Sequence, residues 1–196
     1  YDEAGLYDVT LVGTDSVGCR VTVVEPELIN VLGDIIPNPV QIHAVSVLSN
    51  RQAEIRFSPH QDDDFQYYTI YREEPGLGFL PIDTLHYIHD TLYIDEGPRF
   101  NERSVCYKVT VTNYCGTESK LNLARTHCTV EVSTTPVPGE IVIDWNPYTG
   151  WQEVVQYEIY EVNSYSTLDM TLLDVVPGNI TRYSHYTDDC FIDYSY

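Results

Sequence analysis

Basic side chains are scarce in this sequence. Its 196 residues include 10 lysines and arginines against 30 aspartates and glutamates, which gives a formal net charge of −20 at pH 7. A surface this acidic cannot neutralise a nucleic-acid backbone, and it is repelled by anionic lipid headgroups. The composition therefore excludes nucleic-acid binding through phosphates and charge-driven docking on a membrane.

Several patterns on which enzymes and metal proteins depend are also absent. The sequence has no Gly-x-Ser-x-Gly nucleophile motif, no glycine-rich phosphate loop, and no Cys-x-x-Cys pair or Cys/His cluster at zinc spacing. The six histidines show no ligand spacing, so we interpret them as ordinary polar surface residues. We expect a protein that is not an enzyme and that carries no cofactor.

Long hydrophobic runs are missing as well. No apolar stretch approaches the ~20 residues that cross a bilayer, and no stretch of this sequence has the pattern of a signal peptide. The sequence begins at Tyr1 rather than at a methionine, within a segment that has the pattern of a strand. We therefore expect it to be a fragment of a longer protein.

What the sequence does contain is strand-forming residues. It has 17 tyrosines and a hydrophobic content of 43%, and Tyr, Val, Ile and Thr favour strands. Short strands with alternating apolar and polar residues, separated by glycine- and proline-containing turns, predict an all-β protein built of β-sandwiches. One stretch that could form a helical turn, residues 166–173, is also predicted to be a strand. The clearest alternating segments are residues 7–12, 53–57, 107–111, 140–145 and 157–160.

Two proline-containing breaks, at residues 32–39 and 133–139, predict the domain boundaries. A sandwich takes about 100 residues, so only the middle domain is long enough to be complete. We expect the last domain to stop before its final strands. The predicted division is a first segment at 1–31, a linker at 32–39, a middle domain at 40–132 and a second domain at 133–196.

An internal repeat relates the middle domain to the last one. Phe57 precedes a Tyr-x-Ile-Tyr strand that begins at Tyr68, and Trp145 precedes the same pattern beginning at Tyr157. In each copy we expect the first aromatic to pack under the Tyr-x-Ile-Tyr strand. Each copy continues with an aliphatic, a polar and an aromatic strand, at 79–82, 91–95 and 106–109 in the first and at 171–175, 181–184 and 194–196 in the second.

This strand order resembles that of the fibronectin type III domain. Phe57 departs from the resemblance, because the usual residue there is tryptophan. The first segment has the pattern aromatic-x-x-x-Gly-x-Tyr-x-Val from Tyr1 to Val9, then Asp15 and Cys19, and it resembles the closing hairpin of a PKD domain. The resemblance implies tandem immunoglobulin-like (fibronectin type III-like) sandwiches preceded by the C-terminal strands of a PKD-like domain.

The combination of modules resembles large Bacteroidota adhesins and gliding-motility proteins, in which such modules precede a type B sorting domain of the type IX secretion system. Residues 145–151, Trp-Asn-Pro-Tyr-Thr-Gly-Trp, and the segment from Cys106 to Ser119 carry this resemblance. It implies non-catalytic stalk modules of an exported adhesin or filament at the bacterial cell surface. Their partners would be neighbouring domains of the same chain and the secretion and anchoring machinery. The alternative is a set of accessory or carbohydrate- or calcium-binding modules of a secreted hydrolase.

The five cysteines fit an oxidising compartment better than a metal site. Two of Cys106, Cys115 and Cys128 are expected to pair, either Cys106 with Cys115 or Cys115 with Cys128, and the sequence does not choose between them. Such a bridge would add about 2–3 kcal/mol of stability. Cys19 and Cys190 are expected to pair with cysteines outside this sequence.

Two surface sites are weaker hypotheses. Asp62, Asp63 and Asp64 supply adjacent hard oxygen ligands that could bind calcium, but they lack EF-hand spacing, and a solvated loop is the simpler interpretation. Tyr148 and Trp151 bracket a Thr-Gly turn and could stack on a sugar ring, which would make surface glycans a partner. The competing interpretation is that Trp151 covers the core of its own domain.

Three Asp-Ser/Thr-aliphatic tripeptides suggest sites of covalent modification. They place Ser16, Thr84 and Thr91 after an aspartate and before an aliphatic residue. If the resemblance holds, these are O-glycosylation acceptors of the kind used in that phylum. A glycan at the end of a strand would add bulk and resistance to proteases.

Overall fold

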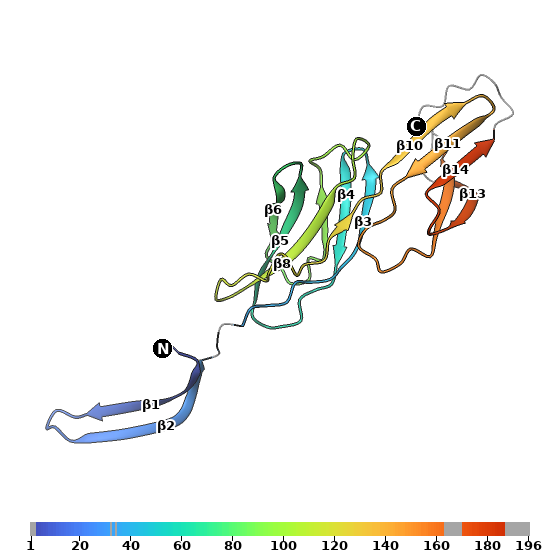
Figure 1. The fold of residues 1–196 in the computed structure, drawn as a ribbon. Coiled ribbons are helices and arrows are strands. Elements are labelled where there is room, and N and C mark those ends of the chain that lie inside the picture. Colours follow the sequence, from blue (N-terminus) through green and yellow to red (C-terminus); the bar gives the residue numbers. More distant parts are fainter. Residues whose placement is uncertain (1–2, 32, 34, 163–169, 187–196) are drawn as a thin grey trace.

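Fourteen β-strands make up the described part of the chain, and none of its residues is helical (Figure 1). The computed structural model describes residues 3–31, 33, 35–162 and 170–186. Within these ranges there is accordingly no helix long and apolar enough to cross a membrane. The prediction of an all-β fold is confirmed, and the strands fall into three groups along the chain.

The first group is an isolated hairpin of β1 (Gly5–Thr14) and β2 (Arg20–Val31). Asp15 closes its turn by accepting hydrogen bonds from the backbone N–H groups of Val17 (3.0 Å) and Cys19 (2.8 Å). These bonds favour the carboxylate and hold the pKa of Asp15 below its usual value. Figure 1 shows the hairpin extending away from the other strands.

The second group is a sandwich of two antiparallel sheets. One sheet has the order β3 (Ile42–Ser49), β4 (Gln52–Phe57), β7 (Leu92–Asp95). The facing sheet has the order β6 (Gly78–Leu85), β5 (Phe65–Glu74), β8 (Cys106–Asn113), β9 (His127–Cys128). This arrangement of three strands facing four is that of the predicted fibronectin type III-like sandwich.

The core of this sandwich follows from the period-two alternation. On β4, Ala53, Ile55 and Phe57 are buried while the residues between them point outward. Phe57 packs edge-on against Tyr68 of β5, with ring centroids 5.0 Å apart and planes at 73°. The predicted packing of the aromatic residue under the Tyr-x-Ile-Tyr strand is therefore confirmed.

A buried ion pair joins the two sheets at one end. Asp95 of β7 accepts two hydrogen bonds from Arg72 of β5, each 2.9 Å long, and a third of 2.7 Å from the hydroxyl of Tyr107 on β8. Burial, and then the nearby carboxylate, raise the pKa of Tyr107 far above its ordinary value, so its hydroxyl remains a donor. Because these partners satisfy Asp95, it supports the fold rather than acid/base chemistry.

The third group repeats part of this plan. β10 (Val132–Val137), β11 (Glu140–Trp145) and β14 (Arg182–Tyr186) form one sheet, and β12 (Gln156–Val162) pairs with β13 (Met170–Pro177). Trp145 packs edge-on against Tyr157 at 5.4 Å and 69°, which closely matches Phe57 and Tyr68. The predicted repeat is thus present in three dimensions. The expected strand at 166–173 is described only from Met170, and the expected strand at 194–196 lies outside the described residues.

The proline-containing segment at 133–139, which was predicted to mark a boundary, lies mostly in β10, and β10 pairs with β11. Pro136 is tolerated there because β10 is the edge strand of its sheet, where a missing N–H leaves no ladder bond unmade. The turn of this hairpin falls at Pro138 and Gly139.

The prediction that two of Cys106, Cys115 and Cys128 pair is confirmed, but neither of the two pairings considered is the one that forms. The disulfide joins Cys106 to Cys128, which lie directly opposite each other on β8 and β9. Cys115 is free and exposed in the turn that follows β8, and Cys19 is also free and exposed. The chain between β8 and β9 brings Cys128 opposite Cys106, and the spacing of the cysteines in the sequence does not specify this pairing. Cys190 lies outside the described residues.

Candidate functional site

The loop between β11 and β12 belongs to the last domain, and it packs against the middle domain. The hydroxyl of Tyr148 accepts a 2.9 Å hydrogen bond from the backbone N–H of Val45 on β3. The same hydroxyl lies 3.0 Å from Nδ1 of His127 on β9. The backbone carbonyl of Thr149 accepts a 3.1 Å bond from the N–H of Cys128. One short loop is therefore hydrogen-bonded to both sheets of the preceding domain.

Trp151 completes this junction. Its indole N–H donates a 2.6 Å hydrogen bond to the carbonyl of His43, at the start of the middle domain. Its ring lies 4.3 Å from that of Tyr148, at an interplanar angle of 37°. On the other side, the backbone N–H of Tyr148 donates to the hydroxyl of Tyr157 (3.0 Å), which belongs to the core of the last domain. Tyr148 thus contacts both domains.

Gly150 is required for the close approach of the two domains. Its φ is +127°, a conformation that side chains rarely adopt. A Cβ at this position would lie 2.3 Å from the imidazole of His127. Any other residue would push the loop away from β9.

His127 is not a surface residue, contrary to the prediction for the histidines. It is 1% exposed, and its ring packs edge-on against that of Tyr148, with centroids 5.8 Å apart. Burial, followed by the positive charge of Arg125 and the proximity of His43, lowers its pKa from 6.5 to about 4. The neutral ring can therefore accept a hydrogen bond from the Tyr148 hydroxyl through Nδ1. Burial in turn raises the pKa of Tyr148.

The two aromatic residues proposed for sugar stacking both belong to this junction. Trp151 keeps 49% of its surface exposed, and with Tyr148 it borders an open groove of about 370 Å³ between the domains. The tilted ring contact with Tyr148 and the bond to His43 give Trp151 a structural role. Its contact with a sugar stays a prediction.

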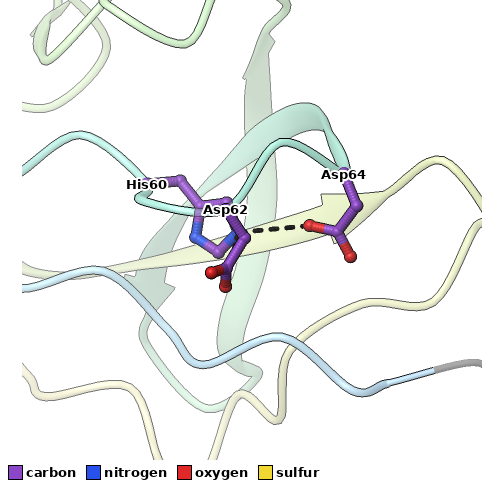
Figure 2. A group of neighbouring side chains, drawn as sticks. All are labelled: His60, Asp62 and Asp64. Atoms are coloured by element: carbon purple, nitrogen blue, oxygen red, sulfur yellow. Dashed lines mark ion pairs between the residues drawn. The ribbon is translucent and has the colours of Figure 1, made fainter.

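A second group of functional side chains lies in the loop between β4 and β5. Of the three aspartates proposed as calcium ligands, the structure brings together Asp62 and Asp64, and it adds His60 rather than Asp63. Figure 2 shows the imidazole and the two carboxylates close together beside this loop. Nε2 of His60 lies 3.5 Å from a carboxylate oxygen of Asp62 and 3.6 Å from one of Asp64.

The proposed glycosylation acceptors lie apart from one another. Ser16 is exposed at the turn of the first hairpin, and Thr84 is exposed on the edge strand β6. Thr91 is half-buried, and its carbonyl accepts a 3.0 Å bond from the N–H of Phe57. Modification of these hydroxyls remains a prediction.

The residues that sequence reasoning missed are histidines and a glycine. His127 and Gly150 acquire their roles only when β9 and the junction loop meet, so no local pattern marks them. His60 does carry a signal, because His60, Asp62 and Asp64 alternate along the chain as His-x-Asp-x-Asp. This pattern places three potential ligands in one loop.

Comparison with known proteins finds no matching family model and no matching curated protein. Among solved structures, the central fibronectin-III array of RIM-binding protein is 16% identical, with a TM-score of 0.41, and the match covers 79% of this chain and 58% of that one. The FN1–FN3 domains of chicken CNTN1 are 15% identical, with a TM-score of 0.39, and 91% of this chain and 64% of that one are covered.

An enzyme is also among the similar structures. The β-1,2-glucanase from Parabacteroides distasonis is 22% identical, with a TM-score of 0.35, and the match covers 54% of this chain and 15% of that one. This chain therefore spans less than two thirds of the length of each of these three structures. The fold assignment rests on the strand order of the middle domain rather than on these likenesses.

Proposed function

We propose that this chain is a series of non-catalytic spacer modules from an exported cell-surface protein, in which it holds a distal binding region away from the cell. The observation that carries the proposal is the junction between the middle and last domains. Tyr148, Trp151 and Gly150 fix the orientation of two successive sandwiches through hydrogen bonds and close packing. A spacer needs such junctions because free hinges would let it collapse.

The charge of the chain supports the same role. A net charge of −20 over 196 residues makes neighbouring modules repel one another, which favours an extended and soluble array. The disulfide between Cys106 and Cys128 fits an oxidising, extracellular environment.

The finer assignment follows from the sequence resemblance. We place the parent protein among the adhesion- or gliding-related proteins of the bacterial surface, exported by the type IX secretion system. The first hairpin would then be the end of a PKD-like domain. The partners of these modules would be the neighbouring domains of the parent chain and the anchoring machinery.

The proposal predicts a single, narrow distribution of distances between the middle and last domains. Pulsed electron paramagnetic resonance can measure it with nitroxide labels at Thr84→Cys on β6 and Thr171→Cys on β13, in a background in which Cys19, Cys115 and Cys190 are serine. Gly150→Ala should broaden the distribution, because the new Cβ would lie 2.3 Å from the ring of His127.

Gly139→Ala is the matched control. Gly139 also has a positive φ, of 82°, but a Cβ there would meet no atom within 4 Å. This variant should keep the narrow distribution. A broad distribution in the parent chain would show that the junction does not hold the domains, and the spacer proposal would then lose its main support.

A further inference from the structure

The β4–β5 loop holds a histidine that is buried and fixed in place. The side chain of His60 is 5% exposed. Its ring lies 6.4 Å from the ring of Phe65, and its backbone N–H donates a 2.8 Å hydrogen bond to the hydroxyl of Tyr68 in the core. Unlike a surface histidine, it is held by the core and cannot easily turn toward solvent.

The outer nitrogen of this ring has no hydrogen-bond partner among the described residues. Nε2 of His60 is buried, and so is Oδ1 of Asp64, which also lacks a partner. The separations of 3.5 Å to Asp62 and 3.6 Å to Asp64 exceed the 2.7–3.2 Å of an N–H···O hydrogen bond. Buried polar atoms are normally satisfied, so these two atoms are placed to bond a ligand that lies between them.

A metal ion would explain these distances. Zinc lies 2.0–2.1 Å from histidine nitrogens and 2.0–2.2 Å from carboxylate oxygens, so two ligands on a tetrahedral ion are separated by about 3.4 Å. The separations of 3.5 Å and 3.6 Å are close to that value. The ligand atoms of all three residues lie within 4.8 Å of one another. Asp62 is largely exposed and can rotate to close the longest separation.

The loop that carries these residues is anchored at both sides. The N–H of Ser58 donates a 2.8 Å bond to the carbonyl of Gln41, and the N–H of Tyr114 donates a 2.8 Å bond to the carbonyl of Asp64. The side-chain amide of Asn113 donates to the carbonyl of Ile35 in the chain that leads from the first hairpin. These contacts put the cluster at the end of the middle domain that faces the preceding module.

We propose that His60, Asp62 and Asp64 bind a divalent transition-metal ion of the zinc type, with water at the remaining position. The imidazole argues against calcium, which takes six to eight oxygen ligands, whereas one nitrogen with two carboxylate oxygens suits zinc and its neighbours in the first transition row. The ion would link the β4–β5 loop to the core and stabilise this end of the domain. The inference does not depend on the proposed spacer function.

Isothermal titration calorimetry of the full chain, stripped of metal with a chelator, tests the site with Zn²⁺ and with Ca²⁺ separately. We expect one zinc ion per chain, no calcium heat, and a higher melting temperature with zinc. Asp62→Asn and Asp64→Asn should each weaken zinc binding by more than about tenfold, because even outer-shell partners of metal ligands contribute 10- to 100-fold. Co²⁺ should give the intense visible absorption of a tetrahedral site.

Asp63→Asn is the matched control, because it removes the same charge from the same loop at a residue outside the cluster. It should bind zinc like the parent chain. His60→Gln should abolish binding, and circular dichroism will show whether it still folds; if it does not, the two asparagine variants decide the question. The proposal is overturned if the parent chain binds no zinc, if calcium binds in its place, or if zinc binding survives Asp62→Asn and Asp64→Asn.

Discussion

His60 and His127 show how burial decides the chemistry of one residue type in this protein. His127 is surrounded by the positive charge of Arg125, the ring of His43 and the hydroxyl of Tyr148, so it stays neutral and accepts a hydrogen bond. His60 faces two carboxylates across gaps too long for hydrogen bonds. Both side chains are buried, but only His60 lies beside carboxylates, those of Asp62 and Asp64, with which it could bind the same metal ion.

The depressed pKa of His127 makes the stability of the chain depend on pH. Between pH 6.5 and about pH 4 the unfolded chain takes up a proton on this ring that the folded chain does not. The free energy of unfolding should therefore fall as the pH falls through this window, by on the order of 2 kcal/mol from this residue.

Urea unfolding at several pH values measures this effect. His127→Gln keeps a hydrogen-bond acceptor but removes the titration, so its stability should fall less steeply over the same window than that of the parent chain. His89→Gln, at an exposed position, should follow the parent chain. Equal slopes for the parent chain and His127→Gln would show that His127 is not held neutral.

Among the strands, the short β9 is held both by a disulfide and by a contact with the next domain. β9 has only two residues, His127 and Cys128, and it forms the edge of the four-stranded sheet. The disulfide from Cys128 to Cys106 ties it to β8. Because His127 carries the contact with Tyr148, the bridge also holds one side of the junction in place.

Removing this bridge should destabilise the middle domain. For a loop closed by two cysteines 22 positions apart in the sequence, the chain-entropy model gives a loss of about 3 kcal/mol. Thermal unfolding should show a lower midpoint for the Cys106→Ser/Cys128→Ser variant, and for the parent chain in reductant. Cys115→Ser, which changes a free and exposed thiol, should leave the midpoint unchanged. An unaltered transition in reductant would contradict the role assigned to the bridge.

At the scale of the whole molecule, the three strand groups differ in how much they bury. The fourteen residues of the main hydrophobic cluster all belong to the middle domain, whereas the strands of the first hairpin are exposed or half-buried along their whole length. A two-stranded hairpin with no packed face is only marginally stable in water. The chain therefore has one strongly stabilised body with weaker elements on either side of it in the sequence.

Hydrogen exchange should show this difference directly. Backbone amides of β1 and β2 should exchange quickly, because the hairpin opens without disturbing any core, while those of β5 and β8 should exchange only on global unfolding. Mass spectrometry of peptides from the exchanged chain measures both. Slow exchange in the hairpin would mean that it packs against another surface.

Much of the fold could be predicted from the sequence because its causes are local. Alternation of apolar and polar residues places the strands, since successive side chains point to opposite faces. The repeated aromatic pairs, Phe57 with Tyr68 and Trp145 with Tyr157, identified two copies of one sandwich. Proline placement was less informative, because Pro136 is compatible with an edge strand as well as with a linker.

The tertiary structure alone decided which distant residues meet. Cys128 faces Cys106 because β9 pairs with β8 in one register, and the spacing of the cysteines does not specify that register. Gly150 is indispensable only because His127, on another domain, occupies the space beside it. The acidic loop became a candidate metal site only when the core oriented the ring of His60 toward Asp62 and Asp64. Local pattern determines which strands form, whereas ligands, bridges and junctions depend on how those strands pack.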